Sequence, residues 1–295
     1  MFVLAHLSDP HLAPLPQPRW SELMGKRATG YVNWRRTRSL IHRSDVLARV
    51  VSDLKASAPD HIAVTGDLVN VSLANEYAPA RAWLESLGPA QDVTLVPGNH
   101  DVYVRGVHRH SQSHWGDYMR GDAGGEPDFP FLRRRGPLAL IGLSSAVPTA
   151  PLMATGRLGS TQVDKLAELL ELCRREGRFR VVLVHHPPQS RPRGHFKRLI
   201  DGARFRAALL RHGAELVLHG HDHVHSVTYL EGPQRRIPVI GVPSASLVPR
   251  AEHGPAGYHL YHITGSAAAW RCQLAIRALS GTGETVSEIN RIVLY

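Results

Sequence analysis

The chain has 295 residues, of which 43% are hydrophobic and 20% are charged, and this composition suits one domain with a sizeable core. No run of eighteen apolar residues is present and only Cys173 and Cys272 occur, which excludes a membrane-spanning protein and a disulfide framework. The net charge of +10 favours an anionic partner.

The chain begins MFVLAHLSDPHL, where the apolar run is short and no basic region precedes it. We therefore expect no signal peptide and a cytoplasmic location, with peripheral contact at the inner membrane surface as an alternative.

Short runs of Leu and β-branched residues that end abruptly in polar residues or Gly predict buried strands. Up to about residue 220 they lie at 2–7, 61–65, 93–96, 138–143, 181–184 and 215–218. Helical patterns fall between them at about 42–57, 75–87, 160–176 and 202–212. Beyond residue 220, strand patterns follow one another at 226–230, 237–242, 258–263, 270–278 and 289–294.

This order predicts an α/β fold, a layered sandwich of two mixed β-sheets flanked by helices, within one domain over residues 1–295. We expect the strands beyond residue 220 to form the second, more antiparallel sheet.

Five of the predicted strands end in residue types that bind metal ions. The groups are Ser8-Asp9-Pro10-His11, Gly66-Asp67, Gly98-Asn99-His100-Asp101, His185-His186-Pro187-Pro188 and Gly220-His221-Asp222-His223. Each group alone also fits an ordinary turn or a satisfied buried histidine. Because ligands of α/β sheets bind beyond the carboxyl ends of the strands, the five groups together indicate a dinuclear metal site.

The blocks DxH, GD, GNHD, H and GHxH resemble the pattern of the calcineurin-like metallophosphoesterases, over residues 1 to about 225. Within that family the chain is most similar to class III cyclic-nucleotide phosphodiesterases and UDP-2,3-diacylglucosamine pyrophosphatases. The resemblance implies one ion held by Asp9, His11, Asp67 and His223. It implies a second ion held by Asp67, Asn99, His185 and His221, so that Asp67 bridges the two.

In the fourth block, we expect His185 to be the ligand that the resemblance implies, with His186 as the alternative. Carboxylate, amide and imidazole ligands without thiolate favour two divalent or mixed-valence ions of manganese, iron or zinc.

The resemblance also implies the chemistry, which is attack on a phosphate-ester substrate by a hydroxide that bridges the two ions. His100 is similar to the family histidine that lies beside the ions and protonates the leaving oxygen. Asp101 is then expected to orient His100.

An insertion of about residues 12–44 lies between the first motif and the first predicted helix, and it combines aromatic and basic side chains. We single out Trp34, Arg35 and Arg36 as candidate substrate contacts. Such a segment suits a lid over an amphiphilic phosphate or a contact with an anionic membrane surface. An insertion that packs on the core with solvated arginines is the alternative.

Two substrates therefore compete for this phosphodiesterase or pyrophosphatase. The insertion favours a lipid-linked nucleotide of the UDP-2,3-diacylglucosamine type, and a 3',5'-cyclic nucleotide is the alternative. A nuclease is a further alternative, but we do not expect a nucleic-acid partner. No recognisable nucleic-acid module occurs, and the positive charge is concentrated in two segments, 19–45 and 191–211.

Overall fold

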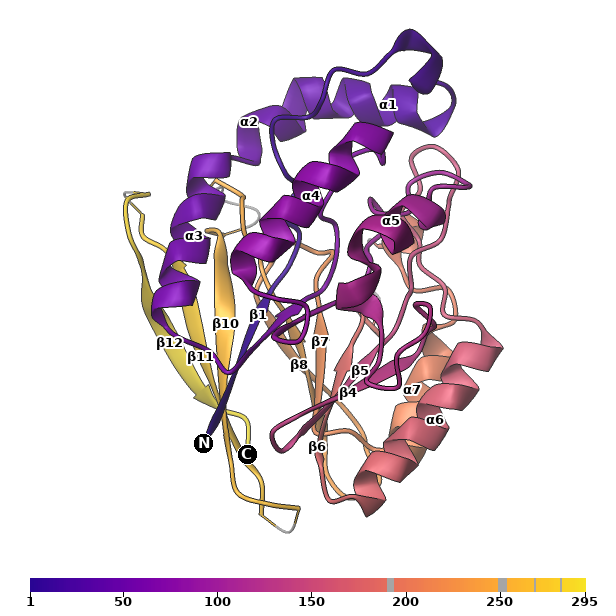
Figure 1. Cartoon of the computed structure of the whole chain (residues 1–295). Coiled ribbons are helices and arrows are strands. Elements are labelled where there is room, and N and C mark those ends of the chain that lie inside the picture. The colour runs from indigo at the N-terminus through magenta and orange to yellow at the C-terminus, as the bar shows by residue number, and fades with distance from the viewer. Residues whose placement is uncertain (190–193, 249–253, 268, 282) are drawn as a thin grey trace.

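Two six-stranded sheets form the centre of the fold (Figure 1). The computed structural model describes residues 1–189, 194–248, 254–267, 269–281 and 283–295. The first sheet has the order β12-β11-β10-β1-β2-β3 and the second has the order β4-β5-β6-β7-β9-β8. Strands of the first sheet are β1 (Phe2–Leu7), β2 (His61–Val64), β3 (Val93–Leu95), β10 (Gly257–Thr264), β11 (Arg271–Leu279) and β12 (Val286–Val293). Strands of the second are β4 (Phe131–Arg135), β5 (Leu138–Gly142), β6 (Phe179–Leu183), β7 (Leu216–His219), β8 (Ser226–Leu230) and β9 (Ile237–Gly241).

Both sheets are mixed, as predicted. Strands β1, β2 and β3 run parallel to one another, and so do β5, β6, β7 and β9. The expected division of the strands between the sheets is wrong, however. Strands β8 and β9 extend the second sheet, whereas β10 to β12 join the first, where Phe2 of β1 lies opposite Ile263 of β10.

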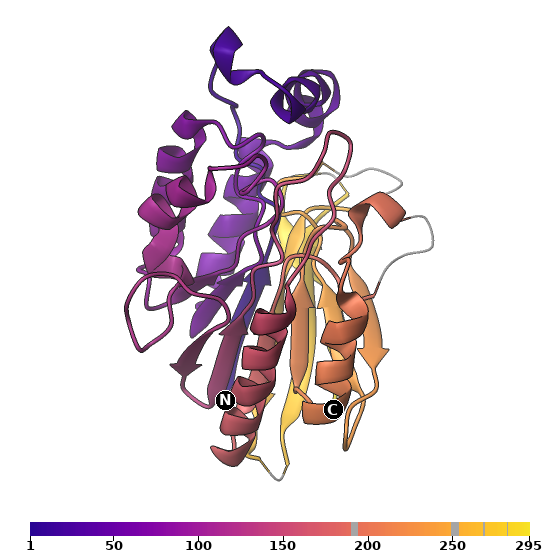
Figure 2. The ribbon, with the colours of Figure 1, turned by 90° about the vertical axis from the view of Figure 1, so that its right-hand side faces the viewer.

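Helices cover the outer faces of the two sheets (Figure 2). Helix α3 (Ser44–Ala56) contacts β10, β11 and β12, and α4 (Ala74–Leu87) packs against α5 (His108–Trp115) on the same side. Helix α6 (Ser160–Arg175) contacts β5 and β6, and α7 (Gly202–His212) contacts β8. We did not predict α5 or β4, because their sequences HRHSQSHW and FLRRR carry too few apolar residues for a clear pattern.

The alternation of side chains along the strands separates two hydrophobic clusters. In β6 and just after it, Val181 and Leu183 belong to the cluster between the sheets, whereas Val182 and Val184 belong to the cluster under α6 and α7. The second sheet is therefore buried on both faces.

The insertion folds into a short 3-10 turn (Trp20–Glu22) and a continuous helical run at the end of the molecule opposite both termini (Figure 1). The run consists of α1 (Lys26–Asn33), one π-helical turn (Trp34–Arg38) and α2 (Ser39–Ile41). π turns inside helices are rare and occur frequently at functional sites.

Polar and close-packed contacts anchor this helical run. The ammonium of Lys26 donates to Thr149 Oγ1 at 2.5 Å and lies over the Tyr103 ring. Gly30 is required where the helix crosses Tyr103, because a Cβ there would lie 2.6 Å from the Tyr103 hydroxyl. The half-buried Tyr31 and Trp34 join a small cluster around Val71. Packing on the core therefore accounts for part of the insertion.

The apolar side chains of Trp20, Met24 and Leu40 are left 91%, 76% and 66% exposed. None of the helices in the described ranges has the length and apolar character needed to cross a membrane.

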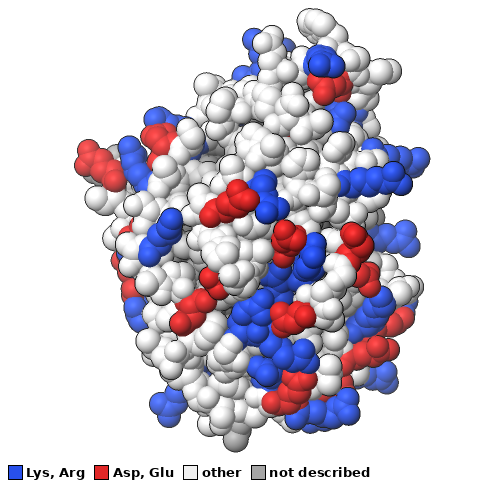
Figure 3. All heavy atoms as spheres, in the orientation of Figure 1, with Lys and Arg blue, Asp and Glu red and all other residues white. Residues whose placement is uncertain are grey.

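Charged side chains of both signs are interspersed on the face shown in Figure 3. Among the described residues, ion pairs such as Arg134–Glu176 at 2.6 Å and Arg135–Asp122 at 2.8 Å join charges of opposite sign. In the second basic segment, Arg204 pairs with Asp164, whereas Arg191 and Arg193 lie outside the described residues. This face does not present the uniform positive field that a nucleic-acid surface requires.

Candidate metal centre

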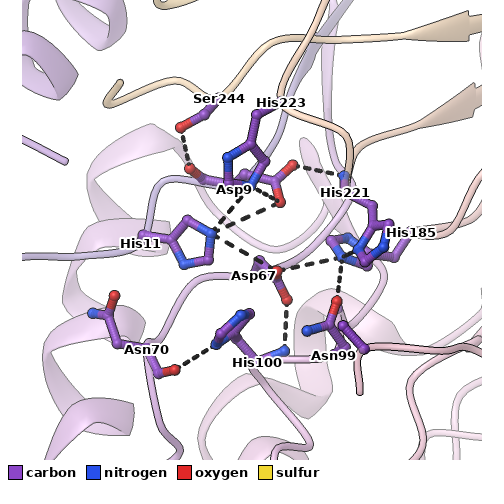
Figure 4. Close-up of polar contacts among 12 residues, drawn as sticks. Asp9, His11, Asp67, Asn70, Asn99, His100, His185, His221, His223 and Ser244 are labelled. Carbon is purple, nitrogen blue, oxygen red and sulfur yellow. Dashed lines mark hydrogen bonds and ion pairs between the residues drawn. The ribbon is translucent and has the colours of Figure 1, made fainter. Parts of the chain in front are cut away.

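The seven expected metal ligands meet at one end of the two sheets (Figure 4). They come from the loops that follow β1, β2, β3, β6 and β7, and all but the partly exposed His223 are buried. The residues are Asp9, His11, Asp67, Asn99, His185, His221 and His223. Two parallel sets of strands thus deliver their carboxyl ends to the same place, as this fold class requires.

Asp67 lies at the middle of the group. Its Oδ2 is 3.4 Å from His185 Nε2 and 3.8 Å from His11 Nε2, and its Oδ1 accepts the backbone N–H of His100 at 2.7 Å. Ligand atoms of Asp9, Asp67 and His185 all lie within 4.8 Å of one another. This position is the one that a bridging carboxylate must occupy.

On one side of Asp67, three ligand atoms crowd together. His223 Nε2 lies 3.1 Å from Asp9 Oδ1 and 3.3 Å from His11 Nε2. The other nitrogen of His11, Nδ1, faces the carbonyl of Val69 at 3.3 Å, which turns Nε2 toward the centre. A cation between these atoms would satisfy them together.

On the other side, His185 and His221 are held in the same manner. His185 donates from Nδ1 to the Thr65 carbonyl at 2.6 Å, and His221 donates from Nε2 to the Lys197 carbonyl at 2.9 Å. Their remaining nitrogens face each other at 3.3 Å, and Asn99 Oδ1 lies 3.2 Å from His185 Nε2. Carboxylate, amide and imidazole donors without thiolate fit divalent metal ions at both positions.

His186 is turned away from this group. Its Nδ1 lies 2.8 Å from Ser145 Oγ and its Nε2 lies 3.1 Å from the Ala154 carbonyl, so protein groups occupy both nitrogens.

The backbone is strained where it presents these side chains. Five of the seven expected ligands have left-handed φ angles between 40° and 69°, namely Asp9, His11, Asp67, His221 and His223. Non-glycine residues adopt this region at a free-energy cost, and they do so mainly at functional sites.

Two glycines allow the loops to approach one another. A Cβ on Gly98 would overlap the Asp67 carboxylate, and a Cβ on Gly220 would overlap Ser8 and the Asp9 carboxylate. The glycines of the motifs are therefore required by close packing.

The expectation that Asp101 orients His100 is not met. The Asp101 carboxylate accepts the backbone N–H groups of Asp67, Leu68 and Gly98 at 2.8 Å and that of Val69 at 3.2 Å. Burial and the nearby Asp67 raise the pKa of Asp101 to about 7. Asp101 thus joins the loops after β2 and β3.

His100 is oriented instead by Asn70, whose carbonyl lies 2.5 Å from His100 Nδ1. Arg38 Nη1 lies 3.3 Å from the same nitrogen, and the ring stacks on Tyr103. Burial and Arg38 lower the pKa of His100 to about 3, so the ring is neutral at pH 7. To act as an acid it needs the negative charge of a substrate to raise that pKa.

A cavity of about 290 Å³ opens beside Asp67, Asn99 and His100. The insertion lines it with Asn33, Thr37, Arg38, Ile41 and His42, and other segments add Ala154, Lys197, His221, Asp222, His223 and Leu247. Trp34, Arg35 and Arg36 are not among the lining residues in the described part of the chain. Arg35 and Arg36 are exposed, and Trp34 stacks on Tyr31.

Arg38, His42 and Asn70 were therefore missed by sequence reasoning. The one available signal was a spacing of four between Arg38 and His42, which places both side chains on one helical face. The backbone N–H of His42 indeed bonds to the Arg38 carbonyl at 2.9 Å.

Comparisons with known proteins agree with this geometry. Residues 2–225 match the family model of the calcineurin-like phosphoesterases. A probable cyclic nucleotide phosphodiesterase of Synechococcus sp. is 27% identical over 231 residues, which is 77% of this chain and 80% of that protein.

Among solved structures, a dimetal phosphatase from Danio rerio has a TM-score of 0.65 at 11% identity, covering 99% of this chain and 98% of that chain. A purple acid phosphatase from yellow lupin has a TM-score of 0.60 at 11% identity, covering 99% of this chain and 53% of that one. At these identities the likeness shows the shared fold. The family match over most of the chain shows that this protein belongs to the calcineurin-like phosphoesterases, metal-dependent hydrolases of phosphate esters.

Proposed function

We propose that this protein is a dinuclear phosphodiesterase that acts on a single nucleotide, with 3',5'-cyclic nucleotides as the first candidate substrates. The observation that carries the proposal is the convergence of seven ligand-type side chains at one end of the sheets, four of which (Asp67, Asn99, His221 and His223) line a cavity of about 290 Å³. The relative from Synechococcus sp., a probable cyclic nucleotide phosphodiesterase, supports this substrate class.

Asp9, His11, Asp67 and His223 would hold one ion, and Asp67, Asn99, His185 and His221 would hold the other. We propose manganese, iron or zinc, because the donor set lacks thiolate. When bound, the two ions supply a water nucleophile of lowered pKa and neutralise charge on the phosphate.

Arg38 would bind the phosphate of the substrate. Its guanidinium lies at the cavity wall 3.3 Å from His100, and its planar group of donors matches a phosphate oxygen pair. A phosphate there brings negative charge close to His100, which raises the pKa of the imidazole toward the range in which it can protonate the leaving oxygen.

The cavity volume argues for a single nucleotide over a lipid-linked one. Sites for small molecules occupy roughly 300–1,000 Å³, and the volume of this cavity, about 290 Å³, lies just below that range. Two acyl chains would have to lie outside it.

A lipid-linked nucleotide of the UDP-2,3-diacylglucosamine type is the second candidate. The exposed Trp20, Met24 and Leu40 on the insertion, close in sequence to Arg35 and Arg36, offer a surface for acyl chains or for an anionic membrane.

The test is hydrolysis by the full chain after chelator treatment and return of Mn²⁺, with cyclic AMP, cyclic GMP, bis(p-nitrophenyl) phosphate and UDP-2,3-diacylglucosamine compared at equal concentration. We expect the cyclic nucleotides to be cleaved with the highest kcat/KM and Asp67→Asn to abolish that cleavage. The exposed Asp164→Asn is the matched control. Preference for the UDP-lipid would establish the second candidate, and cleavage that persists in Asp67→Asn would contradict the proposed site.

A further inference from the structure

His42 is the single histidine of the insertion, and it reaches the metal centre although it belongs to none of the five motifs. We infer that His42 is an additional ligand of the ion held by Asp9, His11 and His223. The inference rests on the proposed dinuclear centre and adds to it a ligand from outside the strand-end loops.

The first observation is the position of the imidazole. His11, His42 and His223 each present a ring nitrogen within 4.8 Å of the other two. The ring centres of His11 and His42 are 4.5 Å apart, and those of His42 and His223 are 5.6 Å apart. Nitrogens bound to one ion at about 2.1 Å lie between about 3.0 Å (cis) and about 4.2 Å (trans) apart. The 4.8 Å limit therefore places His42 beside this coordination sphere, and coordination requires its ring to move toward the ion.

The second observation is the orientation of the ring. His42 Nδ1 lies 2.8 Å from Ser246 Oγ, and the residue is only 2% exposed. Since Nδ1 is engaged there, Nε2 is the nitrogen available to the cavity that His42 lines. Metal-bound histidines are oriented in this way by a hydrogen bond to their remote nitrogen.

The third observation is the backbone around His42. Arg43 N–H bonds to the Ser246 carbonyl at 2.9 Å, and Val248 N–H bonds to the Ile41 carbonyl at 2.8 Å, so His42 pairs with Leu247 as a short antiparallel bridge. Burial of this bridge fixes the end of the insertion.

The loop of residues 244–248, which contains Ser246 and Leu247, also positions Asp9. Ser244 Oγ donates to the Asp9 carbonyl at 2.7 Å, as Figure 4 shows, and Ala245 N–H bonds to the Ser8 carbonyl at 3.0 Å. One loop, residues 244–248, therefore holds an expected ligand from β1 and the imidazole from the insertion in a fixed relation. Coordination by His42 would make the insertion part of the metal centre.

Metal binding measured without turnover tests this inference. Chelator-stripped full chain is titrated with Mn²⁺ by calorimetry, and the bound ion is followed by electron paramagnetic resonance. We expect two ions per wild-type chain. In His42→Ala we expect one site at wild-type affinity and the other weakened at least tenfold, and Ser246→Ala should weaken the same site by a smaller factor. His195→Ala, at an exposed position, is the control.

Hydrogen exchange gives a second readout that does not depend on the stability of one variant. Mn²⁺ should slow exchange of the amides of residues 39–43 in the wild type. At the same Mn²⁺ concentration this slowing should be smaller in Ser246→Ala and absent in His42→Ala. Two ions bound with unchanged affinity in both His42→Ala and Ser246→Ala would overturn the inference, and a raised KM in those variants would then make His42 a substrate contact. A wild type that binds no ion would contradict the proposed function itself.

Discussion

At the scale of single residues, a hydrogen bond to one ring nitrogen of each histidine decides which nitrogen faces the candidate metal centre. His185 and His221 use opposite ring nitrogens to reach backbone carbonyls, Nδ1 to Thr65 and Nε2 to Lys197, and each leaves the other nitrogen facing the centre. The left-handed φ angles of Asp67, His221 and His223 are part of the same arrangement. Hydrogen bonds within the protein thus orient these imidazoles, which lowers the ordering cost of coordination.

Metal affinity should depend on pH through His185. Burial alone lowers the pKa of this imidazole, but the carboxylates of Asp67 and Asp9 outweigh burial and raise the pKa to about 10. Below that pH the ring holds a proton that an ion must displace, so affinity should rise by about tenfold per pH unit between pH 6 and pH 9. Calorimetry in buffers of different ionisation enthalpy should detect about one proton released, and a binding enthalpy independent of the buffer would contradict this.

Arg38 should govern recognition of the phosphate. Replacing Arg38 by Met removes the guanidinium from the cavity wall, and we expect kcat/KM for a phosphodiester to fall by about 10- to 100-fold. Competitive inhibition by inorganic phosphate should weaken in parallel. Arg36→Met is the matched control, since Arg36 lies on the same helical turn and is exposed. Equal effects of both substitutions would remove Arg38 from the site.

At the scale of elements, the loops that follow parallel strands carry the site, and Asp101 joins two of them. Its carboxylate accepts four backbone N–H groups from the loops after β2 and β3. The sequence predicted that these loops would converge, because each ends an apolar strand in metal-binding residue types. The sequence could not predict from which backbone N–H groups Asp101 would accept hydrogen bonds, because those contacts depend on the packing of one loop against another.

Replacing Asp101 by Asn should therefore destabilise the fold. An amide offers one acceptor oxygen and turns its own N–H groups toward backbone donors, so buried N–H groups lose their partners. We expect the free energy of unfolding of the chelator-stripped chain to fall by about 2–4 kcal/mol, measured by urea denaturation. The exposed Asp164→Asn should change it by less than about 0.5 kcal/mol. An equally small change in Asp101→Asn would show that these bonds contribute little.

In the insertion, local sequence patterns do not predict which side chains reach the cavity. The run from Lys26 to Ile41 is helical but contains a π turn. Trp34, Arg35 and Arg36 were chosen for their residue types, yet Arg38 is the arginine of that turn that lines the cavity. The direction of a side chain on a π turn depends on tertiary contacts that composition does not encode.

At the scale of the whole molecule, strand positions could be predicted from apolar runs, but the partners of the strands could not. The C-terminal strands were expected to form a sheet together, whereas β10 pairs with β1 and β9 pairs with β7. Pairings between segments so far apart depend on which apolar faces meet in the folded chain. The motif residues nevertheless lie together as expected, because the core strands were identified and their carboxyl ends meet in either arrangement.

Occupied metal sites should stabilise the whole fold. An ion that binds the native chain and not the unfolded chain adds about 2.7 kcal/mol at a concentration 100 times its Kd. The Tm of the stripped protein should therefore rise by several degrees when Mn²⁺ is returned, and Asp67→Asn should lose most of this rise. A Tm that does not respond to Mn²⁺ would contradict a preformed site.

The central claim is that two ions, bridged by Asp67, carry phosphodiester hydrolysis. It is tested most directly by measuring turnover of bis(p-nitrophenyl) phosphate while Mn²⁺ is added to chelator-stripped enzyme in known equivalents, with bound metal quantified in the same samples. We predict that activity rises until two ions are bound per chain and then stays constant, and that Asp67→Asn remains inactive throughout. Full activity with one bound ion per chain, or activity that survives complete removal of metal, would contradict it.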